Sequence, residues 1–143
     1  MGSIVYDDYA HNPAKIRASW QTAAERHARV LGVWRPHGYG PLRAMAGDLQ
    51  EVFGEVVRPE DRLYVLPVYY AGGTAETSMT STALVARLTE AGVPAAYVPG
   101  YEELKPILAS AAAVDAAVLV MGARDPDLPL FARGLVDAAG MVT

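Results

Sequence analysis

The chain has 143 residues, of which 52% are hydrophobic and 20% charged, with a net charge of -4 and no cysteine. We expect residues 1–143 to form a single soluble domain with one hydrophobic core, and the acidic balance disfavours nucleic acid as a partner. The absence of cysteine excludes disulfides and cysteine-ligated metals. The apolar stretches are too short to cross a membrane and the first eight residues lack a signal peptide, so we expect a cytoplasmic protein with no membrane partner.

Hydrophobic periodicity predicts strands and helices that alternate along the chain. In chain order we predict a strand at 4–6, a helix at 13–29, a strand at 30–34, a helix whose apolar face spans 42–53, a strand at 62–67, a helix capped at 80–81 that stops at 92, a strand at 95–98, a helix at 101–113, a strand at 116–121 and a helix capped by Asp127 that continues to about 139.

Short strands that are apolar on both faces, separated by helices, are typical of a parallel sheet covered on both sides. We therefore predict an α/β fold, a Rossmann-like three-layer domain with a mostly parallel sheet of five or six strands. Ligands bind at the carboxyl ends of the strands in such sheets. The loops at 7–12, 35–41, 68–79 and 122–127 are the candidate binding segments.

The loop at 7–12 gathers polar side chains that suit a binding site: Asp7, Asp8, Tyr9, His11 and Asn12. One interpretation is structural, with the two carboxylates solvated and His11 and Asn12 capping the next helix. The other is a site for a polar ligand, where a carboxylate meets ribose hydroxyls or a metal-bound water and the imidazole donates or accepts a hydrogen bond. Both stay open on local chemistry alone.

The loop at 35–41 carries cations and an aromatic residue close to a predicted helix start: Arg35, His37, Tyr39 and, just beyond the loop, Arg43. A helix N-terminus flanked by cations favours anion binding, although a purely structural turn stays open. Gly38 and Gly40 do not form a dinucleotide fingerprint, because Arg43 stands where the third glycine belongs.

Several common catalytic motifs are absent from the sequence. No glycine precedes a lysine, so there is no P-loop and no lysine to hold the terminal phosphates of ATP. The G-x-S-x-G and H-E-x-x-H motifs are absent too. His27 falls on an apolar helical face and is expected to be a core or boundary histidine. The chain therefore carries part of a site and not a complete catalytic set.

Four segments in order resemble the Mur ligases, especially the group that joins L-alanine to UDP-N-acetylmuramate. Residues 7–13, Asp-Asp-Tyr-Ala-His-Asn-Pro, resemble the D-D-Y-x-H-x-P signature that opens the C-terminal domain of these enzymes. Residues 35–39, Arg-Pro-His-Gly-Tyr, resemble the family's Q-P-H-R-Y. Residues 68–73, Val-Tyr-Tyr-Ala-Gly-Gly, resemble V-Y-x-A-G-E, and residues 120–123, Val-Met-Gly-Ala, resemble the start of Q-G-A-G.

The resemblance implies a C-terminal domain that works with an N-terminal UDP-sugar domain and a central P-loop ATPase domain, both absent from this chain. The implied reaction is ATP-dependent amide formation in peptidoglycan biosynthesis, with ATP and Mg²⁺ bound mainly by the central domain. The implied partners are a UDP-N-acetylmuramate-type substrate, an incoming amino acid or peptide, and the other two domains. Alone, this domain is expected to be inactive, so it contains no catalytic residue of its own.

The resemblance also assigns roles to single residues. Asp8 and His11 would bind the nucleotide. The residues that would contact the incoming substrate are Tyr9, Asn12, Arg35, His37, Tyr39, Arg43, Tyr70 and Arg124. Gly38 and Pro41 stand where the alanine-adding group has arginines, so we expect an acceptor other than L-alanine. Whether Arg43 or Arg124 replaces those arginines stays open.

Two other functions stay open as alternatives. The first is a free-standing Mur-like module that binds a nucleotide or a cell-wall precursor without catalysis. The second is a receiver domain of a two-component system, which also has an acidic pair after its first strand. A receiver needs an aspartate at the end of the third strand and a lysine at the end of the fifth, where this chain has residues 66–68, Leu-Pro-Val, and 121–123, Met-Gly-Ala.

Overall fold

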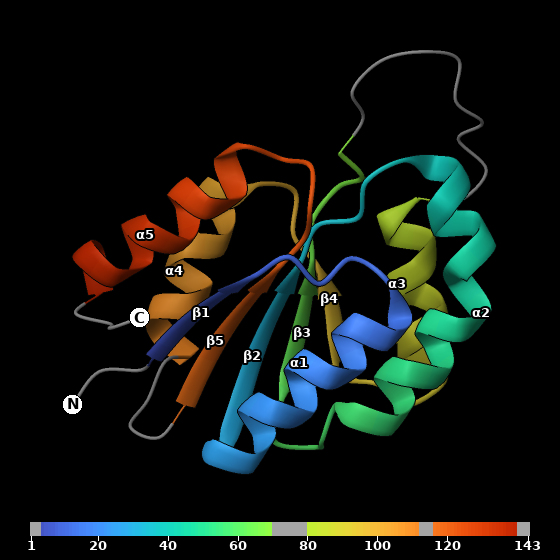
Figure 1. The fold of residues 1–143 in the computed structure, drawn as a ribbon, viewed down its shortest axis with the longest axis horizontal. Helices are drawn as coiled ribbons and strands as arrows, with labels where there is room; N and C mark the ends of the chain where they lie inside the picture. The colour runs from blue at the N-terminus through green and yellow to red at the C-terminus, as the bar shows by residue number, and fades with distance from the viewer. Residues whose placement is uncertain (1–3, 70–79, 112–115, 140–143) are drawn as a thin grey trace.

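The computed structural model describes residues 4–69, 80–111 and 116–139, and for residues 136–139 it describes the backbone only. Within these residues five strands alternate with five helices (Figure 1). The strands are β1 (Ile4–Asp8), β2 (Arg29–Trp34), β3 (Arg62–Val65), β4 (Ala95–Tyr97) and β5 (Ala116–Met121). The helices are α1 (Pro13–Arg26), α2 (Tyr39–Val56), α3 (Ser81–Glu90), α4 (Tyr101–Ala111) and α5 (Asp127–Ala139).

The five strands form one sheet in the order β1-β5-β2-β3-β4, and every pair of neighbours is parallel. Helices α1, α2 and α3 cover one face of the sheet, and α4 and α5 cover the other (Figure 1). A separate hydrophobic core lies on each face, one built around Trp20, Trp34 and Phe53 and the other around Leu104 and Phe131. The predicted three-layer α/β fold is confirmed, with five parallel strands in the described chain.

Helix starts follow the capping signals in the sequence. The Asn12 side chain caps α1 by accepting a hydrogen bond from the backbone N–H of Lys15 at 3.0 Å, and Pro13 occupies the first helical position. Thr80 caps α3 as predicted, accepting from the backbone N–H of Ala83 at 3.2 Å. Pro106 lies inside α4, within the segment predicted to be helical.

Several predicted boundaries are wrong by a few residues. β1 continues through Asp8 rather than ending at residue 6, because Asp8 pairs with Met121 of β5 and the parallel ladder outweighs the polarity of the side chain. α1 ends at Arg26, since β2 begins at Arg29. The expected cap of α5 at Asp127 is also wrong. Asp127 is the first helical residue, and the Asp125 side chain accepts its backbone N–H at 2.9 Å.

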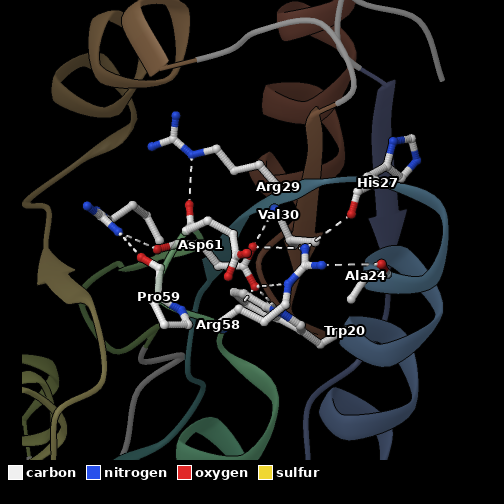
Figure 2. Close-up of polar contacts among 10 residues, drawn as sticks. Trp20, Ala24, His27, Arg29, Val30, Arg58, Pro59 and Asp61 are labelled. Carbon is white, nitrogen blue, oxygen red and sulfur yellow. Dashed lines mark hydrogen bonds and ion pairs between the residues drawn. The ribbon is translucent and has the colours of Figure 1, made fainter.

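A buried polar network closes the amino edge of the sheet (Figure 2). The fully buried Asp61 accepts hydrogen bonds from the Trp20 indole at 3.2 Å and from the backbone N–H of Val30 at 2.8 Å. Arg58 adds two guanidinium contacts to the Asp61 carboxylate, both at 3.0 Å. This network ties α1 and β2 to the turn before β3.

The described helices do not include one long and apolar enough to cross a bilayer.

Candidate functional site

Three loops leave neighbouring strands at the carboxyl edge of the sheet (Figure 1). Residues 9–12 follow β1, residues 35–38 follow β2, and residues 122–126 follow β5, which pairs with both of the other strands. Because the three strands are parallel, the loops emerge side by side. The topology thus joins three of the four segments that the sequence singled out.

His11, His37 and Arg124, one residue from each loop, form what we call the His-Arg cluster. The imidazole rings of His11 and His37 lie 6.0 Å apart between centroids. Burial lowers the pKa of His37, and the charges of Arg124 and His11 lower it further. His37 is therefore mostly neutral at neutral pH, beside the permanent charge of an exposed arginine.

His11 contacts its own loop rather than the helix that follows. Its Nδ1 lies 3.0 Å from the carbonyl oxygen of Tyr9, and this geometry leaves the other ring nitrogen for a different partner. The structural interpretation of this loop is confirmed for Asn12, which caps α1, and is wrong for His11. Tyr9 is 69% exposed, so most of its ring is accessible.

Asp8 connects the end of β1 to α1. Its two oxygens accept hydrogen bonds from the backbone N–H of Ala10 at 3.1 Å and from the Ser19 hydroxyl at 2.6 Å. Asp8 also lines a pocket of about 230 Å³, together with Tyr6 of β1 and Arg26 of α1. His11 is not among the residues that line this pocket. The two residues predicted to bind nucleotide therefore do not share it.

Arg35 is engaged by protein groups. Its Nε lies 3.2 Å from Oδ2 of Asp125, and the two side chains are 17% and 5% exposed. The guanidinium carbon lies 5.9 Å from the ring centroid of Tyr69 and 5.4 Å from that of Tyr101, within range for cation–π contacts. The Tyr101 hydroxyl donates a hydrogen bond to the same Asp125 oxygen. Little of the Arg35 side chain is accessible to a substrate.

The remaining predicted residues lie along or beside α2. Tyr39 is its first residue and lines a second pocket of about 210 Å³ with Thr80 and Tyr97. Arg43 is exposed one turn further along. Gly38 precedes the helix with φ of 79°, a left-handed conformation that favours glycine. Tyr70 lies outside the described residues.

Sequence reasoning missed Asp125 and Tyr101, which bind each other and Arg35. The only local signal for Asp125 was its place in an Asp-Pro pair just before a predicted helix, which is typical of a turn. Tyr101 carried no signal, because nothing in the sequence relates the start of α4 to the loop after β5.

The described residues do not include a group of three or more histidine, aspartate or glutamate side chains placed to hold a metal ion.

Comparison with known proteins identifies the family. The model of the family described as "Mur ligase, glutamate ligase domain" matches residues 1–124. The chain belongs to this family. The resemblance seen in the four sequence motifs is thereby confirmed, and the two histidines and Arg124 all lie within the matched residues.

The similar curated proteins are named as ligases and are much longer than this chain. A UDP-N-acetylmuramate–L-alanine ligase of Rhizobium meliloti is 36% identical over 124 residues, covering 85% of this chain and 26% of the relative. One from Rhizorhabdus wittichii is 37% identical over 143 residues, covering 99% of the chain and 29% of the relative. The chain thus spans less than a third of either relative.

A solved structure shows the same fold. It is a domain assigned to a UDP-N-acetylmuramate:L-alanyl-gamma-D-glutamyl-medo-diaminopimelate ligase of Haemophilus ducreyi, with a TM-score of 0.60. The match covers 94% of this chain and 89% of the other, at 20% sequence identity.

The receiver-domain alternative is wrong. Receiver domains have the strand order 2-1-3-4-5, in which the first strand lies inside the sheet. Here β1 is an edge strand, and β5 lies between β1 and β2. The acidic pair at the end of β1 is therefore at the margin of the sheet rather than at its centre.

Proposed function

We propose that the chain is the C-terminal domain of an ATP-dependent ligase that joins an amino acid or peptide to a UDP-N-acetylmuramate-type substrate in peptidoglycan biosynthesis. Membership of the family supports this proposal, as do relatives named for that reaction. The N-terminal sugar-binding domain and the central ATPase domain would be supplied by the rest of the protein. Because the reaction consumes ATP, we also propose a cytoplasmic location.

In this reaction the sugar-linked carboxylate takes the terminal phosphoryl group of ATP and becomes an acyl phosphate. The incoming amine then attacks the acyl carbon, inorganic phosphate leaves, and the nitrogen loses a proton. Mg²⁺ and the phosphates would be held mainly by the central domain. We assign to this chain the closing of the site and the placement of the amine.

The observation that carries the assignment is the convergence of His11, His37 and Arg124 from three loops at one edge of the sheet. A neutral imidazole at His37 can accept a hydrogen bond from the incoming amine. Arg124, and Arg43 on α2, offer charge for its carboxylate. Tyr9 and Tyr39 would shape the same region, with Tyr70 as a further proposed contact.

For the nucleotide we propose Asp8 as a ribose contact and His11 as a neighbour of nucleotide and substrate. Both Asp8 oxygens already accept one hydrogen bond, but a carboxylate has lone pairs for further donors. The side-chain carbonyl of Asn12 accepts the backbone N–H of Lys15 in the helix cap. Only the side-chain N–H groups of Asn12 could therefore reach a substrate.

The test measures the acceptor KM of the full-length ligase with His37→Ala or Arg43→Ala. If these side chains place the acceptor, each variant should raise that KM by about tenfold, the equivalent of about 1.4 kcal/mol of lost binding. Arg87→Ala is the control, because Arg87 is an exposed arginine in the last turn of α3, at the other edge of the sheet. A KM equal to that of the control would contradict the assignment.

A further inference from the structure

The loops that carry His37 and Arg124 are held together by a cluster of charged and aromatic side chains beneath them. We call Arg35, Asp125, Tyr69 and Tyr101 the loop clamp. We propose that the loop clamp, with the Arg35–Asp125 ion pair at its centre, is a positioning device that sets His37 relative to Arg124. This inference rests on the proposed function, in which those two residues meet the incoming substrate.

The backbones of the two loops already meet where they leave the sheet. The N–H of Arg35 donates to the carbonyl of Met121 at 3.1 Å, which extends the ladder between β2 and β5 by one bond. A Cβ on Gly122 would lie 3.1 Å from the Arg35 carbonyl oxygen and 2.6 Å from a Leu128 methyl carbon. Only a glycine permits this approach. Beyond this point the described residues show no further backbone hydrogen bond between these two loops, so side chains join them.

The ion pair spans the loops at that position. Arg35 is two residues before His37, and Asp125 directly follows Arg124. The Arg35 Nε lies 3.2 Å from the Asp125 carboxylate, and both side chains are largely buried. Because both side chains are largely buried, moving the loops apart would leave each charge without its partner. The ion pair therefore strongly favours the arrangement in which the two loops lie together.

Each partner of the ion pair is fixed by further contacts. Asp125 accepts the Tyr101 hydroxyl from the start of α4 and the backbone N–H of Asp127 from the start of α5. The Tyr101 ring also stacks on Phe131, with centroids 4.8 Å apart. Burial raises the pKa of Tyr101, and its hydrogen bond to Asp125 adds to that effect, so Tyr101 remains a donor at every physiological pH.

The other side of Arg35 is bounded by Tyr69, whose backbone is tied to the His37 loop. The N–H of Gly38 donates to the Tyr69 carbonyl at 2.9 Å, and the N–H of Tyr69 donates to the Pro36 carbonyl at 2.7 Å. These bonds flank His37 on both sides. The guanidinium of Arg35 lies over the Tyr69 ring, so the segment after β3, the His37 loop and the Arg124 loop meet at one side chain.

In this arrangement Arg35 positions the loops. The family resemblance had instead led us to expect that Arg35 contacts the substrate. The family motif has glutamine at this position, and a glutamine carries no charge to pair with Asp125. The Arg35–Asp125 pair therefore belongs to this chain's own version of the loop.

The test is the pKa of His37, followed by NMR of its imidazole in the 143-residue chain, in Arg35→Gln and Asp125→Asn. Burial of the ring and the charges of Arg124 and His11 lower this pKa. The two variants change the local charge in opposite directions. If the clamp acts through position, both should raise the pKa of His37 toward its ordinary value, by at least about 0.5.

Arg17→Gln is the matched control, because it removes the same charge from an exposed ion pair with Glu55 at 2.9 Å. It should leave the pKa of His37 unchanged. Arg35→Lys keeps the charge and should stay closer to the parent value than Arg35→Gln. Where Asp125→Asn fails to fold, Tyr101→Phe removes only the hydroxyl bound to Asp125 and should shift the pKa of His37 in the same direction.

A fall in melting temperature with an unchanged pKa of His37 would overturn the proposal, since the clamp would then be a stability contact alone. Shifts of opposite sign in Arg35→Gln and Asp125→Asn would overturn it too, because they would report direct charge effects. These readouts need no ligase activity. If the pKa of His37 moves as expected while His37→Ala leaves the acceptor KM of the full-length enzyme unchanged, the clamp stands and the proposed substrate role of His37 fails.

Discussion

Asp61 is a fully buried carboxylate at the amino edge of the sheet, and its polar contacts are drawn in Figure 2. Burial raises its pKa, but hydrogen bonds from Arg58, Val30 and Trp20 outweigh burial and hold the pKa below the usual value of 3.8. A carboxyl whose folded pKa is depressed stabilises the fold above its unfolded pKa. That contribution is lost as the pH falls through the folded pKa.

Asp61→Asn keeps the size of the side chain but removes the charge that Arg58 and the surrounding donors meet. We expect the variant to lose about 3 kcal/mol of unfolding free energy at neutral pH, because breaking a buried ion pair leaves its partner uncompensated. Urea denaturation measures this loss. The loss should shrink as the pH falls from about 3.8, the ordinary pKa, toward the lower pKa of the folded state, where the folded parent carboxylate becomes protonated too.

The control for this variant is Asp48→Asn, at an exposed carboxylate on α2, which should change stability by no more than about 0.5 kcal/mol. Equal losses in the two variants would show that the buried network contributes nothing of its own.

At the scale of elements, α1 packs on β2 through a large residue over a small one. A Cβ on Gly32 would lie 2.1 Å from a ring carbon of Trp20, so the indole occupies the space that any side chain there would need. The same indole donates to Asp61, which fixes its orientation. The position of α1 over the sheet depends on this contact.

Gly32→Ala should therefore destabilise the fold by about 1–3 kcal/mol, as overpacking does when neither neighbour can move freely. Thermal or urea unfolding measures the change. Gly54→Ala provides the matched control, because a Cβ on this helical glycine meets nothing within 4 Å. Alanine is the better helix former, so Gly54→Ala should stabilise by about 0.5–1 kcal/mol. A neutral Gly32→Ala would refute the packing argument.

The sequence predicted most elements well because their signals are local. Asparagine and threonine are favoured N-cap residues, and Asn12 and Thr80 cap α1 and α3. The continuous apolar run of β5 is typical of a strand that is buried on both faces of a parallel sheet. The end of β1 was not predictable in this way. Asp7 and Asp8 are strand residues only because β5 offers them a ladder, and no local rule reports a partner more than a hundred residues away.

At the scale of the whole molecule, the chain forms a hydrophobic core on each face of the sheet. In the function we propose, it would supply only part of the ligase site. It holds no lysine after a glycine for the phosphates of ATP. The loops at the carboxyl edge are therefore expected to act on a nucleotide held by another domain.

The purified 143-residue chain should accordingly release no ADP from ATP above background, and should bind nucleotide weakly at best. A coupled assay for ADP checks this, with the full-length ligase as the positive control under identical conditions. Robust turnover by the chain alone would contradict its assignment as one domain of a larger enzyme. A Gly-x-x-Gly-Lys-Ser/Thr segment upstream in the encoding reading frame would support it, whereas a frame without one would favour a free-standing binding module.

From its sequence alone the chain could be placed in a fold class and a family, because periodicity, capping residues and short motifs are properties of neighbouring residues. The same motifs pointed to His11, His37 and Arg124 as separate candidates. Only the tertiary structure decided that they lie near one another, since this depends on β5 lying between β1 and β2. It likewise decided that Arg35 is paired with Asp125 instead of standing free, because a side chain's partner is set by the packing of distant segments and not by its own neighbours in the chain.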